Sequence, residues 1–414
     1  MKKGATPAEE NEVNSSDAAN RHLWLNKRTL TLGIAMMIGI GIGSGLMMPM
    51  ITLYIAATFG LSMAITATVT SMRDMFKAPM EFVSGMLSDR FGRKPILVAS
   101  FPLYALGFFV SVESGGMVFV YVGSIIAGIG AGCLIPAGLA YIGDIVPKEY
   151  EGRAMAIYWG LYSLGVAIGM IACGYCAQKM GYKNTILLGC GFLIAGSFIY
   201  WLGLEESVLR KSSAKHFEFK LSDMKFMVKN WNIMIVVYLT FFLAVERMDM
   251  PATLLPLFAM KGVGINLKDL GFSLFPVSLI AILSYPGGWI ADKVGRKPGL
   301  IISLSIVAIG MFMFAATKNL TMLMLSSGVV FAGTGLGLPT LSALVNDIVP
   351  ANIRGSAVGL TRVAWDLAMV AYPPVVLTIA QKWGWEWMWI VTGLSLVFGI
   401  LITLTIKETR DTEA

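Results

Sequence analysis

The sequence predicts an all-α membrane protein with twelve transmembrane helices in two six-helix halves. Three observations support this prediction. Of the 414 residues, 56% are hydrophobic and only 14% are charged, whereas soluble proteins carry about a quarter charged residues. Long stretches have no formal charge at all, as between Arg28 and Arg73. A segment of the first half also recurs in the second. The composition therefore excludes a soluble enzyme, a disordered chain and a disulfide scaffold.

The uncharged stretches set the expected helices. Crossing a hydrocarbon core takes roughly 20 apolar residues in helical form, and helix is expected because lipid offers no partner for backbone amides. Dividing the stretches at Gly, Pro and polar turns predicts helices over 29–57, 62–88, 95–113, 116–143, 154–178, 184–204, 231–258, 266–291, 298–317, 320–346, 356–381 and 385–407.

The distribution of Lys and Arg predicts the orientation. With the N-terminus inside, 22 of the 32 basic residues lie in cytoplasmic segments and six on the opposite side, as the positive-inside rule requires. We therefore expect a multi-pass protein of the cell inner (plasma) membrane with both termini cytoplasmic, and no nucleic acid is needed to explain the net charge of +7. The predicted organisation is a disordered cytoplasmic tail at 1–28, an N-terminal bundle at 29–204, a cytoplasmic linker at 205–230, a C-terminal bundle at 231–407 and a cytoplasmic tail at 408–414.

An internal repeat relates the two halves. The segment Gly85–Pro95, GMLSDRFGRKP, recurs as GWIADKVGRKP at Gly288–Pro298, 203 residues later. The same offset relates Asp144 and the three residues that follow it to the segment that begins at Asp347. Because six crossings return the chain to the same side, the repeat predicts two halves of equal orientation.

The repeated segment resembles the signature of the major facilitator superfamily in the loop after helix 2, and the second copy after helix 8 is typical of that family. The resemblance spans residues 29–407. It implies two pseudo-symmetric six-helix bundles around a central cavity, the major facilitator fold, which rock between inward- and outward-open states. It also implies that the two loops form a conformational latch, whose residues are Gly85, Asp89, Arg90, Gly92, Arg93, Gly288, Asp292, Gly295 and Arg296.

Several expectations attach to this latch. Gly85 and Gly288 are expected to let a neighbouring helix approach closely. Asp89 and its counterpart Asp292 are expected to meet a helix N-terminus or an arginine such as Arg153 or Arg354.

The resemblance extends to the drug:proton antiporters of the family, but only half of their helix-5 signature is present. Gly160, Gly165, Gly169 and Gly174 stand at suitable spacing, whereas Met170 occupies the position of the expected proline.

Nine charged residues lie at membrane depth, away from the ends of the predicted helices, where each charge costs a few kcal/mol. They are the proton-coupling or substrate candidates Asp74, Glu246, Glu81, Asp249, Asp366, Arg73, Lys77, Arg247 and Arg362. Both histidines lie outside the helices, so a carboxyl group must carry the proton if coupling is to protons, and burial favours its protonated form. Sodium coupling would use the same residues.

Two pairings of these charges are open. Helical spacing and the adjacency of helices 2 and 11 in the family predict the pairs Glu81–Arg362 and Lys77–Asp366 between the halves. The alternative is i,i+4 pairing within each helix. Likewise, Asp74 and Arg247 either pair to close an outer gate or face the cavity and hold a charged substrate.

Aromatic side chains are the remaining candidates for the cavity wall: Tyr54, Tyr158, Trp159, Tyr162, Trp365 and Tyr372. Cys173 and Cys176 form a lone C-x-x-C motif, which we interpret as buried thiols because no second pair or histidine accompanies it. We expect no metal site and no cofactor.

These features predict a secondary active transporter and not an enzyme. Its predicted function is proton-coupled export of small amphipathic organic molecules by alternating access. The alternative is an importer or exchanger of a small organic anion, and a third possibility is a membrane sensor with a transporter fold. The expected partners are a small-molecule substrate, protons or sodium, and membrane lipid, with no nucleic acid and a monomeric chain.

Overall fold

The computed structural model describes residues 27–113, 115–207, 229–348 and 354–406. The predicted tail at 408–414 lies outside this part of the chain, as do almost all of the tail at 1–28 and most of the linker at 205–230.

The first half begins with one continuous helical segment made of α2 (Lys27–Ala35), the π-helix η1 (Met36–Ile42) and α3 (Gly43–Phe59). It continues with α4 (Met63–Phe91), α5 (Arg93–Glu113), α6 (Met117–Ile145) and α7 (Lys148–Gly203). Gly181 interrupts α7 with a φ of 81°, a conformation that glycine adopts without steric cost. The long helix therefore comprises two crossings joined at Gly181.

The second half also begins with a segment that contains π-helices: α9 (Trp231–Ala244), η2 (Val245–Leu254), α10 (Leu255–Leu257) and η3 (Phe258–Val263). The next crossing joins α11 (Leu267–Leu274), the short 3₁₀ segment η4 (Phe275–Ser278) and α12 (Leu279–Lys293). It is followed by α13 (Arg296–Ala315), α14 (Leu320–Ile348), α15 (Arg354–Trp383) and α16 (Trp385–Thr403).

These segments confirm the predicted twelve-helix fold within the described residues. Nine spans are long and apolar enough to cross a membrane, and one of them, Tyr150–Gly203, contains two crossings. The other two crossings are α4 and the segment 231–263, which carry most of the intramembrane charges.

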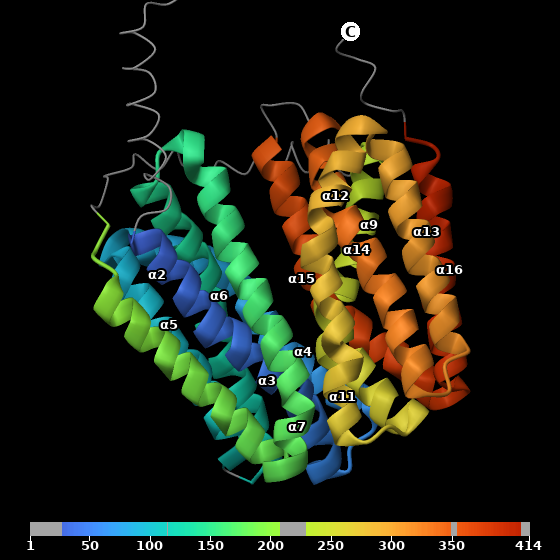
Figure 1. Ribbon diagram of the computed structural model, residues 1–414, viewed down its shortest axis with the longest axis horizontal. Helices are drawn as coiled ribbons and strands as arrows, with labels where there is room; N and C mark the ends of the chain where they lie inside the picture. Colours follow the sequence, from blue (N-terminus) through green and yellow to red (C-terminus); the bar gives the residue numbers. More distant parts are fainter. Residues whose placement is uncertain (1–26, 114, 208–228, 349–353, 407–414) are drawn as a thin grey trace, which may run out of the picture.

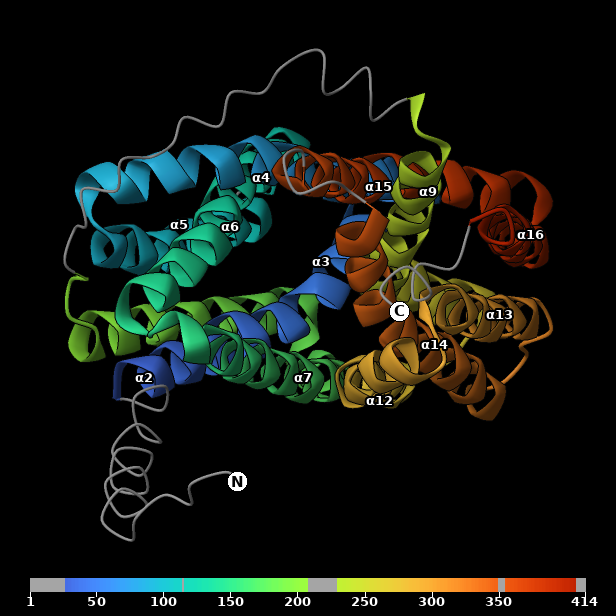
Figure 2. The ribbon, with the colours of Figure 1, turned by 90° about the horizontal axis from the view of Figure 1, so that it is seen from above.

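The two halves stand side by side (Figure 1), with α2 to α7 in one group and α9 to α16 in the other. Viewed from above (Figure 2), α4 lies beside α15, with α3 nearer the centre, and α7 meets the second half at α11 and η4. We call the side of the molecule that carries the turns at Gly92 and Gly295 the latch side. The opposite side, where α3 ends and Gly181 lies, is the far side.

Glycines of the helix-5 half-signature explain how α7 packs. A Cβ atom at Gly165 would lie 2.9 Å from the Cα of Gly41, and one at Gly169 would lie 2.9 Å from the Cα of Gly45. Small residues at such crossings let helix backbones touch. These two glycines therefore hold α7 against the first segment of its own half.

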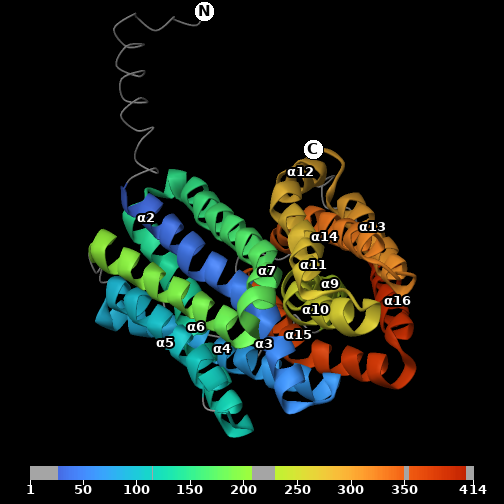
Figure 3. The same ribbon diagram turned by 60° about the horizontal axis from the view of Figure 1, so that its bottom comes forward.

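Gly174 makes a contact between the two halves on the far side. A Cβ atom there would collide with the carbonyl oxygen of Leu267 and would lie 2.7 Å from the amide nitrogen of Gly271. Figure 3 shows α7 and α11 side by side at this point. A second contact between the halves joins α3 to η2, where the Thr52 hydroxyl donates to the carbonyl oxygen of Ala252, 3.3 Å away. The far side is therefore closed by a tight seam, which we call the far-side seam.

Enlarging Gly174 should open this seam. In a background without the native cysteines, we expect Gly174→Leu to increase several-fold the labelling of Ser44→Cys by a membrane-impermeant maleimide applied from the far side. The reason is that the leucine side chain cannot fit against the α11 backbone. Gly191→Leu is the matched control, because nothing lies within 4 Å of a Cβ atom there. Equal labelling in both variants would contradict the packing described here.

Candidate functional site

The repeated loops form two matching ion-pair clusters on the latch side. Arg93 binds Asp89 at 2.6 Å, and its Nε lies 3.2 Å from Asp144. In the second half Arg296 binds Asp292 at 2.6 Å, and its Nε lies 3.0 Å from Asp347. Every member is related to its counterpart by the 203-residue offset. Each arginine thus joins its loop to the end of the fourth helix of its own half.

Glycines allow the turns that hold these clusters. Gly92 and Gly295 have φ values of 97° and 116°, which residues with a Cβ atom rarely adopt. Arg90, the remaining latch residue, places its guanidinium 5.4 Å from the Phe91 ring centroid. In the first half Glu206 accepts a hydrogen bond from the backbone nitrogen of Arg93 at 2.7 Å.

The expectation for the aspartates holds in part, and the expectation for Gly85 and Gly288 is wrong. Asp89 meets an arginine, but its partner is Arg93, the first residue of α5, and not Arg153. The Arg354 side chain lies outside the described part of the chain. Gly85 has no heavy atom within 4 Å of an added Cβ, and Gly288 has only one, at 4.0 Å. Neither glycine is therefore a close-packing point.

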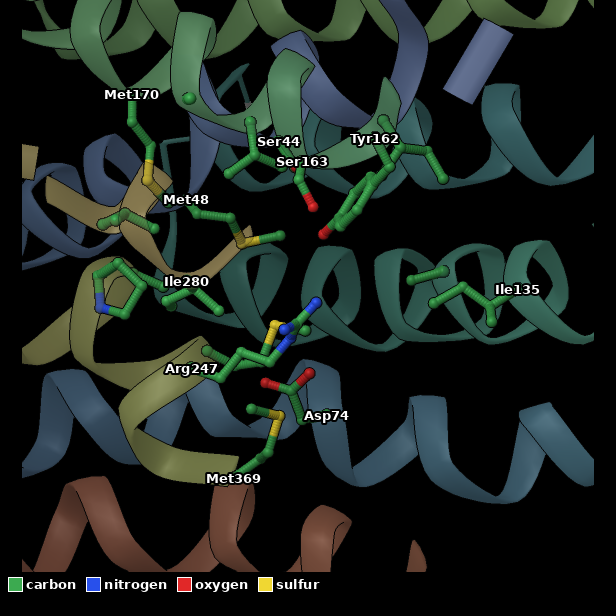
Figure 4. Close-up of a pocket in the computed structure, with 18 of the residues that line it drawn as sticks. Ser44, Met48, Asp74, Ile135, Tyr162, Ser163, Met170, Arg247, Ile280 and Met369 are labelled. Atoms are coloured by element: carbon green, nitrogen blue, oxygen red, sulfur yellow. The ribbon is translucent and has the colours of Figure 1, made fainter. Parts of the chain in front are cut away.

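A cavity of about 1150 Å³ lies between the two halves. We call it the central cavity. Its wall combines segments from both halves: α4 to α7 and the η1–α3 region of the first, and η2, η4, α12 and α15 of the second. The lining residues are Ile40, Ser44, Met48, Arg73, Asp74, Lys77, Tyr104, Ala131, Leu134, Ile135, Tyr162, Ser163, Val166, Ala167, Met170, Arg247, Met248, Pro251, Ala252, Val277, Ser278, Ile280 and Met369. Figure 4 shows Asp74, Arg247 and the Tyr162 hydroxyl directed into it.

Three glycines of α6 position the charged helix α4. Cβ atoms at Gly128 and Gly132 would lie 3.2 Å from the backbone nitrogens of Lys77 and Glu81 respectively. A Cβ atom at Gly130, on another face of α6, would lie 2.7 Å from the Cα of Tyr104 on α5. Close helix packing on both faces of α6 therefore holds the charges of α4 and the ring of Tyr104 at fixed positions in the cavity wall.

Asp74 is held by its neighbour in the chain. It is only 5% exposed, and Arg73 Nη2 lies 2.6 Å from Asp74 Oδ2 while Arg73 Nε lies 3.3 Å from Oδ1. Arg73 also contacts the sulfur of Met48. The predicted Asp74–Arg247 pair is therefore absent, because Arg73 occupies both oxygens of Asp74.

Arg247 has no such partner. Its side chain lines the central cavity and makes no hydrogen bond or ion pair with any residue in the described ranges. A guanidinium is always charged in proteins. The cavity therefore presents one uncompensated positive charge.

Four charges connect α4 and α15 between the halves. Arg362 donates to Glu81 through Nε at 3.0 Å and Nη2 at 2.6 Å, so this predicted pair is present. Lys77 lies 3.1 Å from Glu81, and Arg362 lies 3.7 Å from Asp366. The pairing between halves and the pairing within each helix therefore coexist in one neutral cluster. The other predicted pair, Lys77–Asp366, is not formed.

Two carboxylates of η2 are buried without partners. Glu246 is 1% exposed and Asp249 is 5% exposed. Both oxygens of Glu246 and the Oδ2 of Asp249 are enclosed without a hydrogen-bond partner among the described residues. Neither residue lines the central cavity.

Asp249 instead lines a second, much smaller cavity next to the first, which we call the seam cavity. Its lining residues are Met48, Ile51, Thr52, Thr70, Ser71, Arg73, Asp74, Asp249, Ala252 and Thr253. It is thus bounded by both halves and shares Arg73 and Asp74 with the central cavity.

Most of the predicted aromatic residues do not face the central cavity. Of the six, only Tyr162 lines it. Tyr54 donates to the carbonyl oxygen of Val112 at 3.1 Å, and Tyr372 donates to Thr392 at 2.7 Å. Tyr158 is fully buried in its own half, and Trp159 and Trp365 lie outside the cavity wall.

Sequence reasoning missed several wall residues. They are Tyr104 and the methionines Met48, Met170 and Met369. Met170 carried a signal, because it stands at the position of the missing proline in the antiporter signature. The others lie on apolar helix faces that no charge distinguishes. Methionine side chains adapt to varied ligands, so this wall suits a molecule with an apolar body.

Known proteins resemble the chain over nearly its whole length. The profile described as Major Facilitator Superfamily matches residues 33–284 and 250–414. The class H tetracycline resistance protein of Pasteurella multocida is 25% identical over 391 residues, covering 90% of this chain and 94% of that protein. Multidrug resistance protein 2 of Bacillus subtilis is 21% identical over 382 residues, with 90% and 94% covered.

Solved structures share the fold. The crystal structure of a bacterial homologue of the human lysosomal transporter Spinster superposes with a TM-score of 0.74 at 14% sequence identity. The alignment covers 91% of this chain and 95% of that one.

The Glu81–Arg362 pair should be energetically coupled. Replacing both residues by Gln is expected to cost less stability than the sum of the two single replacements, because either single variant leaves one charge without its partner. We expect a coupling energy of about 0.5–1 kcal/mol, since Arg362 is partly exposed and solvent screens the pair. The measurement is a double-mutant cycle on the thermal unfolding of the purified protein.

The matched control combines Arg362→Gln with Lys382→Gln. Lys382 is exposed near the far end of α15, so these two effects should add. If Glu81→Gln and Arg362→Gln also add, the two side chains do not interact in the protein.

Proposed function

The chain belongs to the major facilitator superfamily, and on this premise we propose that it is a secondary active exporter of small amphipathic organic molecules, driven by inward proton flow. The members of this family that it matches by name are transporters and not enzymes. The proposal concerns its substrate, its direction and its coupling ion.

The central cavity carries the proposal. It lies between the two halves, and its wall combines methionine and aliphatic side chains with the hydroxyls of Tyr162, Ser44 and Ser163 and a few charges. Binding sites for small molecules are mostly apolar with a small number of placed polar groups. Such a wall suits an amphipathic molecule better than a sugar, which would need many hydrogen-bond partners. The relatives named for tetracycline and multidrug resistance support export.

The arrangement of the halves supports alternating access. The far-side seam joins the two halves at Gly174 and Gly271, and the central cavity lies between the same two halves. We propose that the latch side is cytoplasmic, that the protein lies in the plasma membrane, and that the bundles 29–204 and 231–407 rock about the central cavity. The paired loops at Gly85–Pro95 and Gly288–Pro298 would then act as the latch that limits this motion.

Proton coupling is supported by the buried carboxyl groups. Glu246 and Asp249 have no ion pair with a described residue, and an uncompensated charge in a medium of low dielectric constant is costly. Taking up a proton removes that cost. Glu81 and Asp74 are weaker candidates, because each is already bound to an arginine.

A second candidate function rests on Arg247. Its uncompensated charge in the cavity wall favours an importer or exchanger of a small organic anion, which would supply the missing partner. Anion and proton would then travel together, because a negative substrate favours protonation of nearby carboxylates. Export of amphipathic molecules remains the proposal that the wall as a whole supports.

Transport by proteoliposomes separates these functions. We expect uptake of tetracycline or ethidium into vesicles with an acidic lumen, since protons leaving the vesicle would drive the probe in. Asp249→Asn should abolish the dependence on the gradient. The matched control is Asp269→Asn, a partly exposed position of the same half, which should transport like the parent protein. The readout is accumulated probe, with protein-free vesicles for subtraction.

Three results bear on the proposal differently. Uptake of 1-naphthalenesulfonate into vesicles with an alkaline lumen, with no response of the other two probes, would favour the anion function. If no probe responds to a pH gradient of either sign, proton coupling is wrong. If Asp249→Asn retains the full response, the proton is carried by another group.

A further inference from the structure

The seam cavity has the properties of an ion site. It is enclosed by residues of α3 and α4 from one half and of η2 from the other. Its wall includes four hydroxyl groups, those of Thr52, Thr70, Ser71 and Thr253, together with two carboxylates. Hard cations bind such oxygen ligands.

The formal charges of its wall do not balance. Arg73 contributes one positive charge, and Asp74 and Asp249 contribute one negative charge each. Arg73 and Asp74 neutralise each other through two contacts, at 2.6 and 3.3 Å. The charge of Asp249 is therefore left over, and one monovalent cation would restore neutrality.

Asp249 is also free to act as a ligand. It is 95% buried, its Oδ2 is enclosed without a partner, and no described residue donates a hydrogen bond to it. The charged groups that interact with it electrostatically are Asp74, Arg73 and Lys77, all on α4, and Lys77 is already paired with Glu81.

Two of the four hydroxyls are also free to bind a cation. Ser71 and Thr253 are buried residues whose hydroxyls make no hydrogen bond within the described ranges. By contrast, Thr70 donates to the carbonyl oxygen of Ala67 at 2.9 Å, and Thr52 donates across the seam to Ala252. Both of these oxygens retain lone pairs that can accept a hydrogen bond or bind a cation.

We propose that the seam cavity binds one monovalent cation, a proton or Na⁺, with Asp249 as the anionic ligand and the surrounding hydroxyls as neutral ligands. This deepens the proposed function, on which it rests, by separating the site of the coupling ion from the site of the substrate. The site consists of groups from both halves, so it is complete only while the far-side seam is closed.

The two sites are also connected. Arg73 and Asp74 belong to the walls of both cavities. A substrate that contacts this pair from the central cavity changes the electrostatic potential at Asp249, a few side chains away. Substrate and cation can therefore influence each other's affinity without direct contact.

Infrared difference spectroscopy of the purified protein tests the site. The carboxyl stretching band of a protonated aspartic acid should rise and fall with pH in the parent protein, and this component should vanish in Asp249→Asn. Replacing choline by Na⁺ at constant pH and ionic strength provides the second arm. Loss of the band on adding Na⁺ assigns the ion as sodium, whereas dependence on pH alone assigns it as a proton.

A second variant keeps the test valid if Asp249→Asn does not fold. Thr253→Val retains the carboxylate and removes one neutral ligand, so the cation affinity should fall by about tenfold. Thr240→Val is the matched control, because the hydroxyl of Thr240 is also buried in the second half but bonds within its own helix, at 2.7 Å to Val236. It should leave the titration unchanged.

The outcomes separate this proposal from the proposed function. If Asp249→Asn keeps the same pH- and Na⁺-dependent band, or if Thr253→Val and Thr240→Val behave alike, the seam cavity is not the cation site. In that case gradient-driven transport by the parent protein would still support proton-coupled export. If the seam cavity binds sodium and transport does not respond to the proton gradient, the proposed proton-driven function is contradicted, whereas the proposed cation site is supported.

Discussion

A charge inside a membrane protein must be neutralised by a partner, and this constraint organises the structure. Arg73 neutralises Asp74, and the cluster of Lys77, Glu81, Arg362 and Asp366 is neutral across the two halves. Pairing of this kind offsets the cost of burial. Arg247, Glu246 and Asp249 are left without partners among the described residues, all on one π-helix. Of these, Arg247 and Asp249 line cavities, so ligands that move through the protein can complete these two positions.

The positions of Arg247 and Asp249 separate the proposed substrate site from the proposed cation site. Arg247 faces the central cavity between apolar and hydroxyl side chains, and Asp249 faces the seam cavity, which both halves must close. Gly174 and Gly271 bring the halves into backbone contact beside it. The far-side seam is in equilibrium between a closed and an open state. An ion that binds the closed state more tightly shifts this equilibrium toward closure, by an amount set by its difference in affinity for the two states. Coupling then needs no rigid connection beyond the shared Arg73–Asp74 pair.

The helices, the fold and the repeat could be predicted from sequence, because membrane thickness and uncharged stretches leave few alternatives. The Glu81–Arg362 pair was also within reach, since helical spacing places both residues at similar depth. The rotation of each helix about its own axis could not be predicted from the sequence. Whether Tyr54 or Tyr104 faces the cavity depends on a rotation of α3 or α5 that apolar faces on all sides do not encode. Nor does spacing reveal that Arg73 turns back onto its neighbour Asp74, because that choice is made by side-chain rotamers and packing.

We propose that cation binding at Asp249 holds the far-side seam closed. Spin labels at the exposed far-side positions Thr58 and Lys261, one in each half, report the width of the seam through their distance distribution. We predict that raising the concentration of the bound cation, H⁺ or Na⁺, increases the short-distance population in the parent protein, and that Asp249→Asn loses this dependence. A distribution that ignores the cation, or that responds equally in Asp249→Asn, would contradict it.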